Sequence, residues 1–477
     1  MTRPTLVWMR HSLRLGDHPA LHGAASTGGP VVPVFIWAPE EEGGWAPGGA
    51  SRWWLHHSLA ALDTALAARG SRLVLRRGPT AETLADLAKT LGAGEVWWNR
   101  RIEPAARRQE EAVALALRVA GIAARPCAPD LLVPPESLLN KSGGPFQVFT
   151  PFWKAATTQI PVPEPLPAPA ALTPPETWPE SLQLDALDLL PAVDWAGGLR
   201  EHWRPGEAGV PDLLSAFLDG AAAQYPEARD RPGVPGTARL SPHLHFGEIS
   251  PRAVFHAAQL RAFAGAEKGV EAWVRQLYWR EFGHYMLRHF PHTPEAPLRG
   301  EFAAFPWRDD PAGLRAWRRG LTGYPIVDAG MRELWRTGWM HNRVRMIAAS
   351  FLVKDLLLPW QAGAAWFWDT LVDADLANNT LGWQWTSGCG PDAAPYFRVF
   401  NPVLQGEKFD PDGGYVRRWV PELAGLDNQW IHRPWEAPEL LLHAAGVVLG
   451  ETYPKPIVEH AGARDRALLA HGQIRRG

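Results

Sequence analysis

The chain has 477 residues, enough for about two to four domains of ordinary size. Hydrophobic residues make up 46% and charged residues 21%, which is ordinary for a soluble globular protein and excludes a mainly disordered chain. The formal charge of −2 at pH 7 excludes a surface coated in basic charge, although it leaves room for a local basic groove.

Cysteine content and the N-terminus bear on the cellular compartment. Cys127 and Cys389 are too few for a disulfide framework or a cysteine-based zinc site. The first ten residues lack the apolar run of a signal peptide, and no stretch reaches the roughly 18 continuous apolar residues of a membrane helix. We therefore expect a cytoplasmic protein that does not associate with membranes.

Short apolar runs alternate with amphipathic runs between residues 5 and 128. The runs at 5–9, 31–37, 72–77, 95–99 and 122–127 are typical of buried strands, and helical periodicity lies near 51–69, 80–91 and 104–120. This order predicts a doubly wound parallel α/β sheet with right-handed crossovers. No dinucleotide fingerprint or Walker loop is present, because the glycines of 43–49 have the wrong spacing. We therefore expect any nucleotide cofactor elsewhere in the chain.

Prolines mark the way to a second domain. Residues 161–179 contain eight prolines, which predicts an extended connector. From about residue 205 helical periodicity dominates, and Ser241-Pro242 and Ser250-Pro251 are typical of helix starts in which Ser is the cap. We expect an α/β domain at 1–130, a Pro-rich connector at 131–204 and a mostly α-helical domain at 205–477.

Arginine and tryptophan are interleaved between residues 270 and 345. Twelve arginines outnumber the eight acidic residues of this stretch by four, within a slightly acidic chain. Arginine with aromatic side chains can grip phosphates while stacking on bases. On charge alone, the alternative is a solvated helical face with ordinary salt bridges.

Residues 373–385 combine two carboxylates, three carboxamides and two tryptophans. Trp383 and Trp385 are two positions apart, which directs their rings to roughly opposite sides of a helix. Asn379 offers both a donor and an acceptor, and Asp373 can hold a neighbouring arginine. The stretch is typical of a pocket wall, and a polar turn capped by core tryptophans is the alternative.

Several segments together resemble the photolyase/cryptochrome family of flavoproteins. They are Tyr225 with Thr237–Pro242, Trp279–Phe282, Thr322–Met331, Gly338–Met346, Asp373–Trp385, Asp392–Arg398 and Gln405–Phe409, with Leu13-Arg14, Ala20-Leu21, Trp37–Gly43 and Ser51–Trp54 in the N-terminal half. The order is consistent over nearly the whole chain. Within the family, the chain resembles most the bacterial cyclobutane pyrimidine dimer photolyases that are also similar to plant cryptochromes.

The resemblance implies a helical domain that binds FAD non-covalently and an antenna chromophore in the α/β domain, with methenyltetrahydrofolate favoured over a deazaflavin. The residues that it assigns to FAD are Tyr225, Thr237, Ala238, Arg239, Leu240, Ser241, Arg280, Arg345, Asp373, Asp375 and Asn379. Arg345 is expected to pair with Asp373, and Asn379 to face flavin N5. Asparagine there favours a fully reduced anionic flavin over a protonated one-electron-reduced form, whereas plant cryptochromes tend to carry Asp.

The resemblance also implies a light-driven lyase that repairs cyclobutane pyrimidine dimers, with a blue-light photoreceptor as the alternative. A tryptophan relay would run from Trp383 through Trp360 to Trp307. Trp279 and Trp385 would wedge a flipped dimer, while Asn342 and Met346 share a helical face toward it. The residues assigned to UV-damaged DNA are Arg229, Gln276, Trp279, Asn342, Arg343, Met346, Trp385, Arg398 and Lys408. We expect a monomer without an obligate protein partner.

Three positions bear on how far the resemblance reaches. Gln276 stands where cyclobutane-type enzymes usually carry Glu, so it can bind the dimer but cannot supply a carboxylic proton. Ser12 replaces an Asp of the N-terminal motif, which bears on local structure or the antenna. Met346 replaces the His of (6-4) enzymes, which disfavours that substrate.

His243-Leu-His245 resembles a metal pair only superficially, and no metal site is expected.

Overall fold

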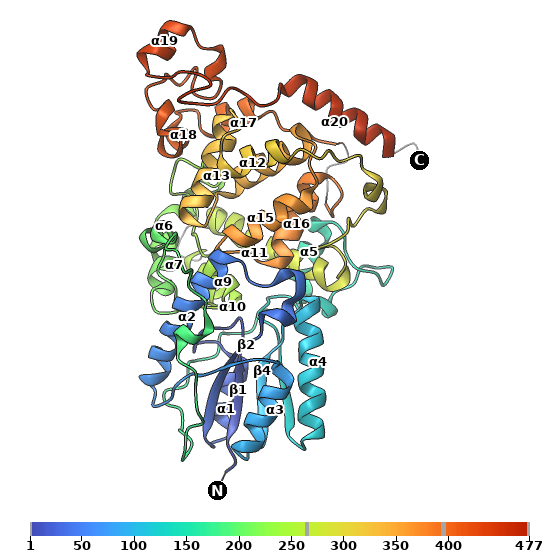
Figure 1. Ribbon diagram of the computed structural model, residues 1–477. Coiled ribbons are helices and arrows are strands. Elements are labelled where there is room, and N and C mark those ends of the chain that lie inside the picture. Colours follow the sequence, from blue (N-terminus) through green and yellow to red (C-terminus); the bar gives the residue numbers. More distant parts are fainter. Residues whose placement is uncertain (1, 263–266, 393–396, 475–477) are drawn as a thin grey trace. The chain divides into compact units, whose positions relative to one another are not determined.

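The computed structural model describes residues 2–262, 267–392 and 397–474, and its chain divides into two compact units (Figure 1). Unit 1 comprises Met1–Ala223, Ala238–Pro291 and Val372–Leu376. Unit 2 comprises Gln224–Thr237, His292–Leu371 and Ala377–Gly477. This division into units does not test the predicted domain bounds at residues 130 and 204, which stay a prediction. Residues 393–396, part of the matched segment 392–398, lie outside the described residues.

Unit 1 contains a five-stranded parallel sheet in the order β3-β2-β1-β4-β5. The strands are β1 (Thr5–Met9), β2 (Val31–Trp37), β3 (Val74–Arg77), β4 (Glu95–Asn99) and β5 (Ala123–Cys127). β1 and β2 are buried along their whole length, as continuous apolar runs covered on both faces must be. The predicted doubly wound α/β fold is confirmed, with β3 and β5 beginning two and one residues later than predicted.

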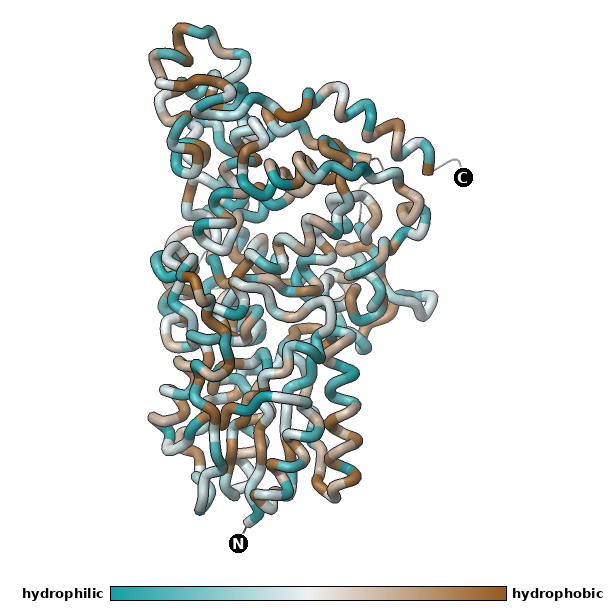
Figure 2. The backbone as a smooth tube through the Cα atoms, in the orientation of Figure 1, coloured by the Kyte–Doolittle hydropathy of each residue, from teal (hydrophilic) through white to brown (hydrophobic). Residues whose placement is uncertain are grey.

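The helices of unit 1 connect the strands and extend the unit beyond the sheet. They are α1 (Pro19–Ser26), α2 (Gly49–Ala67), α3 (Thr80–Thr90), α4 (Pro104–Val119), α5 (Phe149–Gln159), α6 (Gly197–His202), α7 (Val210–Asp219), α9 (Ser241–His245), α10 (Pro251–Arg261) and α11 (Glu267–His289). In Figure 2, α4 alternates between teal and brown stretches, as an amphipathic helix packed on β5 and α3 requires. The sequence did not predict α1, whose start depends on His18 Nδ1 accepting from the Leu21 N–H at 3.0 Å.

The Pro-rich segment is extended, but it is attached to unit 1 by backbone hydrogen bonds. Residues 161–169 form no helix or strand. The Leu166 carbonyl accepts from the Asp17 N–H at 2.7 Å, and the Thr173 carbonyl accepts from the Val31 N–H at 2.9 Å. Both acceptors are carbonyls of non-proline residues, and the prolines of the segment have no N–H with which to donate a hydrogen bond.

Unit 2 is helical, as predicted. Its helices are α8 (Tyr225–Ala228), α12 (Pro311–Arg319), α13 (Pro325–Thr337), α14 (Asn342–Ser350), α15 (Trp360–Thr370), α16 (Leu376–Ser387, whose first residue belongs to unit 1), α17 (Pro402–Phe409), α18 (Gly414–Trp419), α19 (Glu439–Ala444) and α20 (His460–Ile474). α13 packs against α12, α14, α17 and α18. A π-helical segment, Phe351–Asp355, follows α14 and packs against α15 and α20.

Of the two predicted serine caps, one is confirmed. Ser250 Oγ caps α10 by accepting from the Ala253 N–H at 2.9 Å. The prediction for Ser241 was wrong, because α9 begins at Ser241 itself and Leu240 occupies the cap position. Among the described residues, no helix is both long and apolar enough to span a bilayer.

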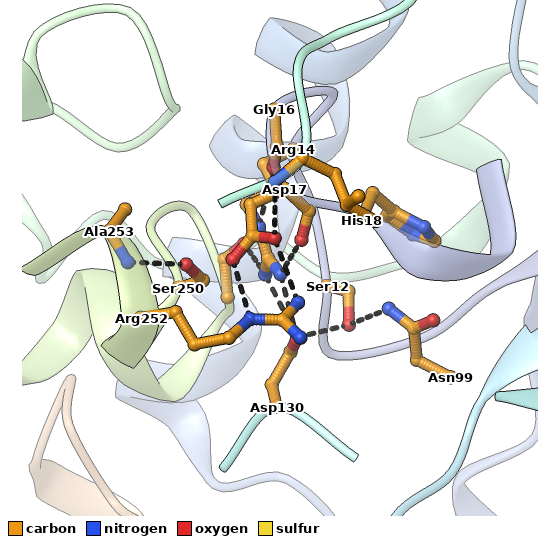
Figure 3. A network of polar contacts seen from close by, with 12 residues as sticks. Ser12, Arg14, Gly16, Asp17, His18, Asn99, Asp130, Ser250, Arg252 and Ala253 are labelled. Carbon is orange, nitrogen blue, oxygen red and sulfur yellow. Dashed lines mark hydrogen bonds and ion pairs between the residues drawn. The ribbon is translucent and has the colours of Figure 1, made fainter. Parts of the chain in front are cut away.

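A buried ion-pair network ties the N-terminal loop of unit 1 to later segments (Figure 3). Arg14 pairs with Asp130 at 2.7 Å, and Arg252 pairs with Asp17 at 2.8 Å. Ser12 Oγ donates to Asp130 at 2.5 Å and accepts from Asn99 at 3.1 Å. A hydroxyl can do both, whereas the family's Asp could only accept when ionised. Ser12 therefore belongs to the local architecture of the α/β unit.

The Arg14–Asp130 pair predicts an acid-sensitive contribution to stability. Burial opposes ionisation of Asp130, but Arg14 and Ser12 lower its pKa to about 2. A carboxyl pKa depressed from 3.8 to about 2 adds roughly 2 kcal/mol that is complete above pH 4 and lost as pH falls toward 2. Asp130→Asn should cost about 3 kcal/mol at pH 7, because it strands a buried guanidinium. Urea unfolding at pH 7 and pH 3 measures both effects.

The exposed pair of Arg77 and Asp188, 2.9 Å apart, gives the matched control. Asp188→Asn should change the unfolding free energy by at most about 1 kcal/mol. Equal losses for Asp130→Asn and Asp188→Asn would contradict the structural role of the buried pair.

Candidate functional site

The sheet of unit 1 reverses its strand order between β1 and β4, and a small cavity lies just beyond their carboxyl ends. Its volume is about 50 Å³. Ligand sites of open parallel sheets lie at this kind of switch point. The residues that line it are His11, Ser12, Asn99, Arg100, Arg101, Ile102, Glu103, Pro129, Asp130, Leu131, Leu244, His245, Arg280, His284 and Asp375. Two predicted cofactor residues, Arg280 and Asp375, are thus brought to one cavity.

Asp375 is surrounded by two histidines and an arginine within unit 1. Its Oδ2 lies 3.6 Å from His284 Nε2 and 3.9 Å from His245 Nδ1. Burial opposes its ionisation, but His284, His245 and Arg280 hold the pKa of Asp375 well below its usual range. Burial lowers the pKa of His284 to about 4. At neutral pH the carboxylate is therefore ionised, His284 is neutral and Arg280 supplies the lasting positive charge.

His284 and Glu281 are two residues of α11 that sequence reasoning missed. Neither ring nitrogen of His284 makes a hydrogen bond within the described residues, although the side chain is buried. The Glu281 carboxylate accepts the N–H groups of Leu132 and Val133 at 2.7 and 3.0 Å and pairs with Arg280 at 2.8 Å. The available signal was helical spacing, since His284 stands one turn after Arg280.

The predicted phosphate-binding loop has the backbone geometry of an anion nest. Arg239 adopts a positive φ of 52°, which is uncommon for a non-glycine residue, and Leu240 follows in the right-handed helical region. Successive N–H groups in such an alternation converge on one point and favour an anion. Ala238 is buried beside them, while Thr237 and Tyr225 belong to unit 2. In unit 2, the Arg229 guanidinium lies 5.5 Å from the Tyr225 ring centre.

Helix α16 fixes the orientation of Asn379 in unit 2. Asn379 Nδ2 donates to the Ala364 carbonyl of α15 at 3.1 Å, so its Oδ1 is left to accept. Trp383 lies one turn further on, and Phe367 packs edge-on against its ring at 5.0 Å. The buried Trp383 indole N–H has no acceptor among the described residues. The Asn379 carboxamide oxygen, as an acceptor, and the Trp383 indole N–H, as a donor without a partner, could both interact with the polar edge of a ring system.

The predicted tryptophan relay differs from residue to residue in burial. Trp383 and Trp360 are each 2% exposed, whereas Trp307 is partly exposed and packs on Phe305 at 4.3 Å. Trp383 also makes an edge contact with Trp317 at 6.1 Å. The order of burial agrees with Trp307 as the outer member, and the relay itself stays a prediction.

The remaining cofactor prediction concerns Arg345 and Asp373. Arg345 Nε donates to the Met340 carbonyl at 2.7 Å in unit 2, and its guanidinium lies 5.9 Å from the Trp339 ring centre. Asp373 is buried in unit 1, where its carbonyl accepts from the Asp375 N–H at 2.8 Å. The pairing of Arg345 with Asp373 stays a prediction.

The predicted DNA residues of unit 1 lie on α11. Trp279 stacks on Phe149 with ring centres 3.8 Å apart and planes 9° apart. Arg275 lies 5.5 Å from the Phe149 ring centre and 4.6 Å from that of Trp153. Gln276 Nε2 donates to the Ala272 carbonyl at 3.2 Å. The family resemblance did not include the Phe149 platform, which holds the Trp279 ring flat.

Among the predicted DNA residues of unit 2, Arg343 contacts both an acidic and an aromatic side chain. Arg343 pairs with Asp230 at 2.9 Å, and its guanidinium lies 4.3 Å from the Phe409 ring centre. Met346 shares its helix face, with Sδ 3.9 Å from Arg343 Nη1. The sequence missed Asp230, which also lies 3.8 Å from Arg229.

Four further predicted residues lie elsewhere in unit 2. Asn342, Arg398 and Lys408 are exposed. Trp385 is partly exposed, and its indole donates to the Asp392 carbonyl at 3.1 Å. His243 and His245 have separate partners in unit 1, since His243 bonds Glu248 at 2.5 Å. Within the described ranges, no group of three or more potential ligands has the arrangement of a metal site.

Comparison with known proteins adds an independent line of observation. Two family profiles match: "DNA photolyase" over residues 5–170 and "FAD binding domain of DNA photolyase" over residues 273–473. A deoxyribodipyrimidine photo-lyase of Agrobacterium fabrum strain C58 is 50% identical over 476 residues, covering 100% of this chain and 99% of that protein. Cryptochrome-1 of Arabidopsis thaliana is 42% identical over 484 residues, covering 98% of this chain and 70% of that protein.

The fold comparison agrees with the sequence comparison. The crystal structure of a bacterial class III photolyase from Agrobacterium tumefaciens superposes with a TM-score of 0.97 at 49% identity, covering 100% of this chain and 98% of that one. An α/β region followed by a helical FAD-binding region, as predicted from the sequence, is thereby confirmed.

Two glycines near Trp383 give a test of how tightly its ring is held. A Cβ at Gly363 would lie 2.0 Å from the Trp383 ring and 2.6 Å from Leu352. Gly363→Ala should therefore overpack this site and cost about 1–3 kcal/mol. A Cβ at Gly382, on exposed helix surface, meets nothing within 4 Å, so Gly382→Ala should gain about 0.5–1 kcal/mol. Thermal unfolding and near-UV circular dichroism measure the difference, and similar melting of both variants would contradict it.

Proposed function

This chain belongs to the photolyase/cryptochrome family, and we propose that it uses FAD and light to repair cyclobutane pyrimidine dimers in DNA. The family profile over residues 273–473 and the full-length similarity to deoxyribodipyrimidine photo-lyase support this proposal. The structural observation that carries it is the amide of Asn379, whose nitrogen is occupied by the Ala364 carbonyl and whose oxygen is left as an acceptor.

The residues present fit the cofactor. The backbone nest at Arg239 and Leu240 would hold phosphate oxygens, and Asp375 beside Arg280 would bind the polar edge of the ring system. When bound, reduced FAD supplies an electron to the dimer in light and regains it after the two bonds between the bases break. The Asn379 Oδ1 acceptor would hold a proton-bearing ring nitrogen without giving up a proton itself.

The proposed DNA surface combines aromatic wedges with arginines. The rigid Trp279 platform and Trp385 would flank a flipped dimer, and Arg343, which lies against Phe409 and beside Asp230, would contact a phosphate. A dimer stacks and pairs poorly, so it costs less to extrude than a normal base step. An antenna chromophore in unit 1, methenyltetrahydrofolate in preference to a deazaflavin, is part of the same proposal.

A blue-light receptor with the same cofactor is the second candidate, because Arabidopsis cryptochrome-1 is 42% identical. The two candidates differ at position 379, where an Asp would place an oxygen against the Ala364 carbonyl and would have to remain protonated. The Asn found here has no acidic proton that it could transfer to the ring. This feature favours repair.

Light-dependent repair tests the proposal directly. Reduced protein mixed with dimer-containing oligothymidine should restore thymine absorbance in light and leave it unchanged in darkness. Gln276→Glu should raise turnover, because a carboxylic acid can donate a proton that Gln276 cannot. Gln276→Ala, the control at the same position, removes the polar group altogether and should weaken substrate binding. A protein with reduced FAD that restores no absorbance in light would favour the receptor.

The DNA surface predicts opposite effects for two partners in one ion pair. Arg343→Ala should weaken DNA binding and lower the salt slope of log K by about 1, because one phosphate contact is lost. Asp230→Asn should strengthen binding, because it removes the acid that lies 2.9 Å from Arg343 and 3.8 Å from Arg229. Titrations of labelled DNA at two salt concentrations measure both changes.

Arg200→Ala, which breaks an exposed pair with Asp194 in unit 1, serves as the control and should leave DNA affinity unchanged. Weaker binding by Asp230→Asn would show that Asp230 positions Arg343 rather than competing with the phosphate.

A further inference from the structure

A second cavity, of about 210 Å³, lies wholly within unit 2. It is formed by the end of α14 with the π-helical segment, the 299–302 turn, the C-terminal end of α16, the 397–400 segment and α20. The lining residues are Arg299, Glu301, Phe302, Ser350, Lys354, Trp385, Thr386, Gly388, Phe397, Arg398, Phe400, His471 and Ile474. Only Trp385 and Arg398 among them belong to the site proposed above.

Lys354 is the buried cation of this cavity. Its side chain is fully enclosed, with 1% of the residue exposed. Nζ lies 3.3 Å from the Phe397 ring centre and donates to the Arg398 carbonyl at 3.3 Å. An ammonium group has three donors, and no further hydrogen bond from Nζ is made to the described residues. Buried donors are normally satisfied, so a lysine that uses one of three has capacity for a ligand.

Among the described residues of unit 2, Lys354 has no ion-pair partner. The charges of Cys389 and Asp355 would favour its ammonium form, but burial raises the pKa of Cys389 to about 12, which leaves that thiol neutral. Asp355 Oδ1 is occupied by His460 Nδ1 of α20 at 2.5 Å. Burial accordingly lowers the pKa of Lys354 to about 7. An acceptor in the cavity would favour the charged form.

The walls and the rim suit a planar ring that carries an anion. His471 stacks on Phe397 with ring centres 4.3 Å apart and planes 8° apart. The ammonium lies 3.3 Å above the same ring, so the two must flank opposite faces, which fixes Phe397 as a rigid wall. At the exposed rim, Arg299 and Arg398 stand against one acid, Glu301. Arginine is well suited to phosphate because its donors form a planar fork.

The volume limits the ring that can enter. A cavity of about 150 Å³ is enough to bind benzene, so 210 Å³ holds a six-membered ring with part of a sugar but leaves little room for a purine. Pyrimidine bases carry carbonyl oxygens that accept hydrogen bonds.

We propose that this cavity binds one pyrimidine nucleotide, with a base carbonyl accepting from Lys354 and the phosphate held by Arg299 and Arg398. The nucleotide can come from two sources, a free mononucleotide or an unpaired residue of a DNA strand. The second source rests on the proposed DNA-repair function, because Trp385 and Arg398 are shared with that surface.

The test is isothermal titration calorimetry of the FAD-containing protein. The protein is titrated with thymidine 5′-monophosphate and, separately, with undamaged oligothymidine. Lys354→Met keeps the length and burial of the side chain but removes its donors, and should weaken saturable binding at least tenfold. Arg299→Gln, at the exposed rim, should weaken it several-fold and carries little risk to folding. Lys89→Met, on the exposed face of α3 in unit 1, is the matched control and should change nothing.

The outcomes separate the two sources and the two proposals. Loss of mononucleotide binding in the Lys354→Met variant assigns a free nucleotide, and loss of oligothymidine binding alone assigns a strand residue. Absence of saturable binding by the parent protein, or equal affinities in parent, Lys354→Met and Arg299→Gln, overturns the proposal. Binding that depends on Lys354 in a protein without light-dependent repair would uphold this site and reject the repair function.

Discussion

Unit 2 depends on a buried carboxylate that collects donors from distant parts of the chain. Asp328 is completely buried in α13. It accepts from the N–H and hydroxyl of Thr322, both at 2.7 Å, from the Gly323 N–H at 3.0 Å and from the Tyr453 hydroxyl at 2.7 Å. Burial raises its pKa even though these donors stabilise the ionised form. The bonds fix the start of α13 against the C-terminal region, and α13 in turn packs on the helix that carries Arg343 and Met346.

The elements that were predictable from the sequence are those whose signal is local. β1 and β2 are continuous apolar runs, so their bounds could be read residue by residue. Helix α1 was missed because its eight residues carry no strong periodicity and its cap is a histidine, which is not among the usual capping residues. Ser241 shows the converse, because a Ser-Pro pair begins a helix without Ser occupying the cap position.

The sequence predicts which residues form the candidate site, but it does not predict their contacts. Family motifs lead us to expect Asn379, Arg343 and Trp279 in the site, and the immediate partners of these three residues are Ala364, Asp230 and Phe149. None of these partners carries a recognisable motif, and each comes from a different element brought close only by folding. Such partners decide the chemistry. The Ala364 carbonyl leaves the oxygen of the Asn379 amide as the acceptor, and the Asp230 carboxylate offsets the charge of Arg343 before any ligand binds.

The π-helical segment after α14 shows how one local irregularity serves two neighbouring residues. Lys354 lines the cavity of unit 2, while the next residue, Asp355, binds the start of α20 through His460 and accepts from Arg466 through its carbonyl. π-helical turns are rare and are frequently found at functional sites. In a regular α-helix the side chains of Lys354 and Asp355 would also point about 100° apart. The π-helical turn holds one residue more than an α-helical turn, so the residues after it face different neighbours from those they would face in a regular α-helix. In this segment Asp355 is committed to α20, while Lys354 lines its cavity.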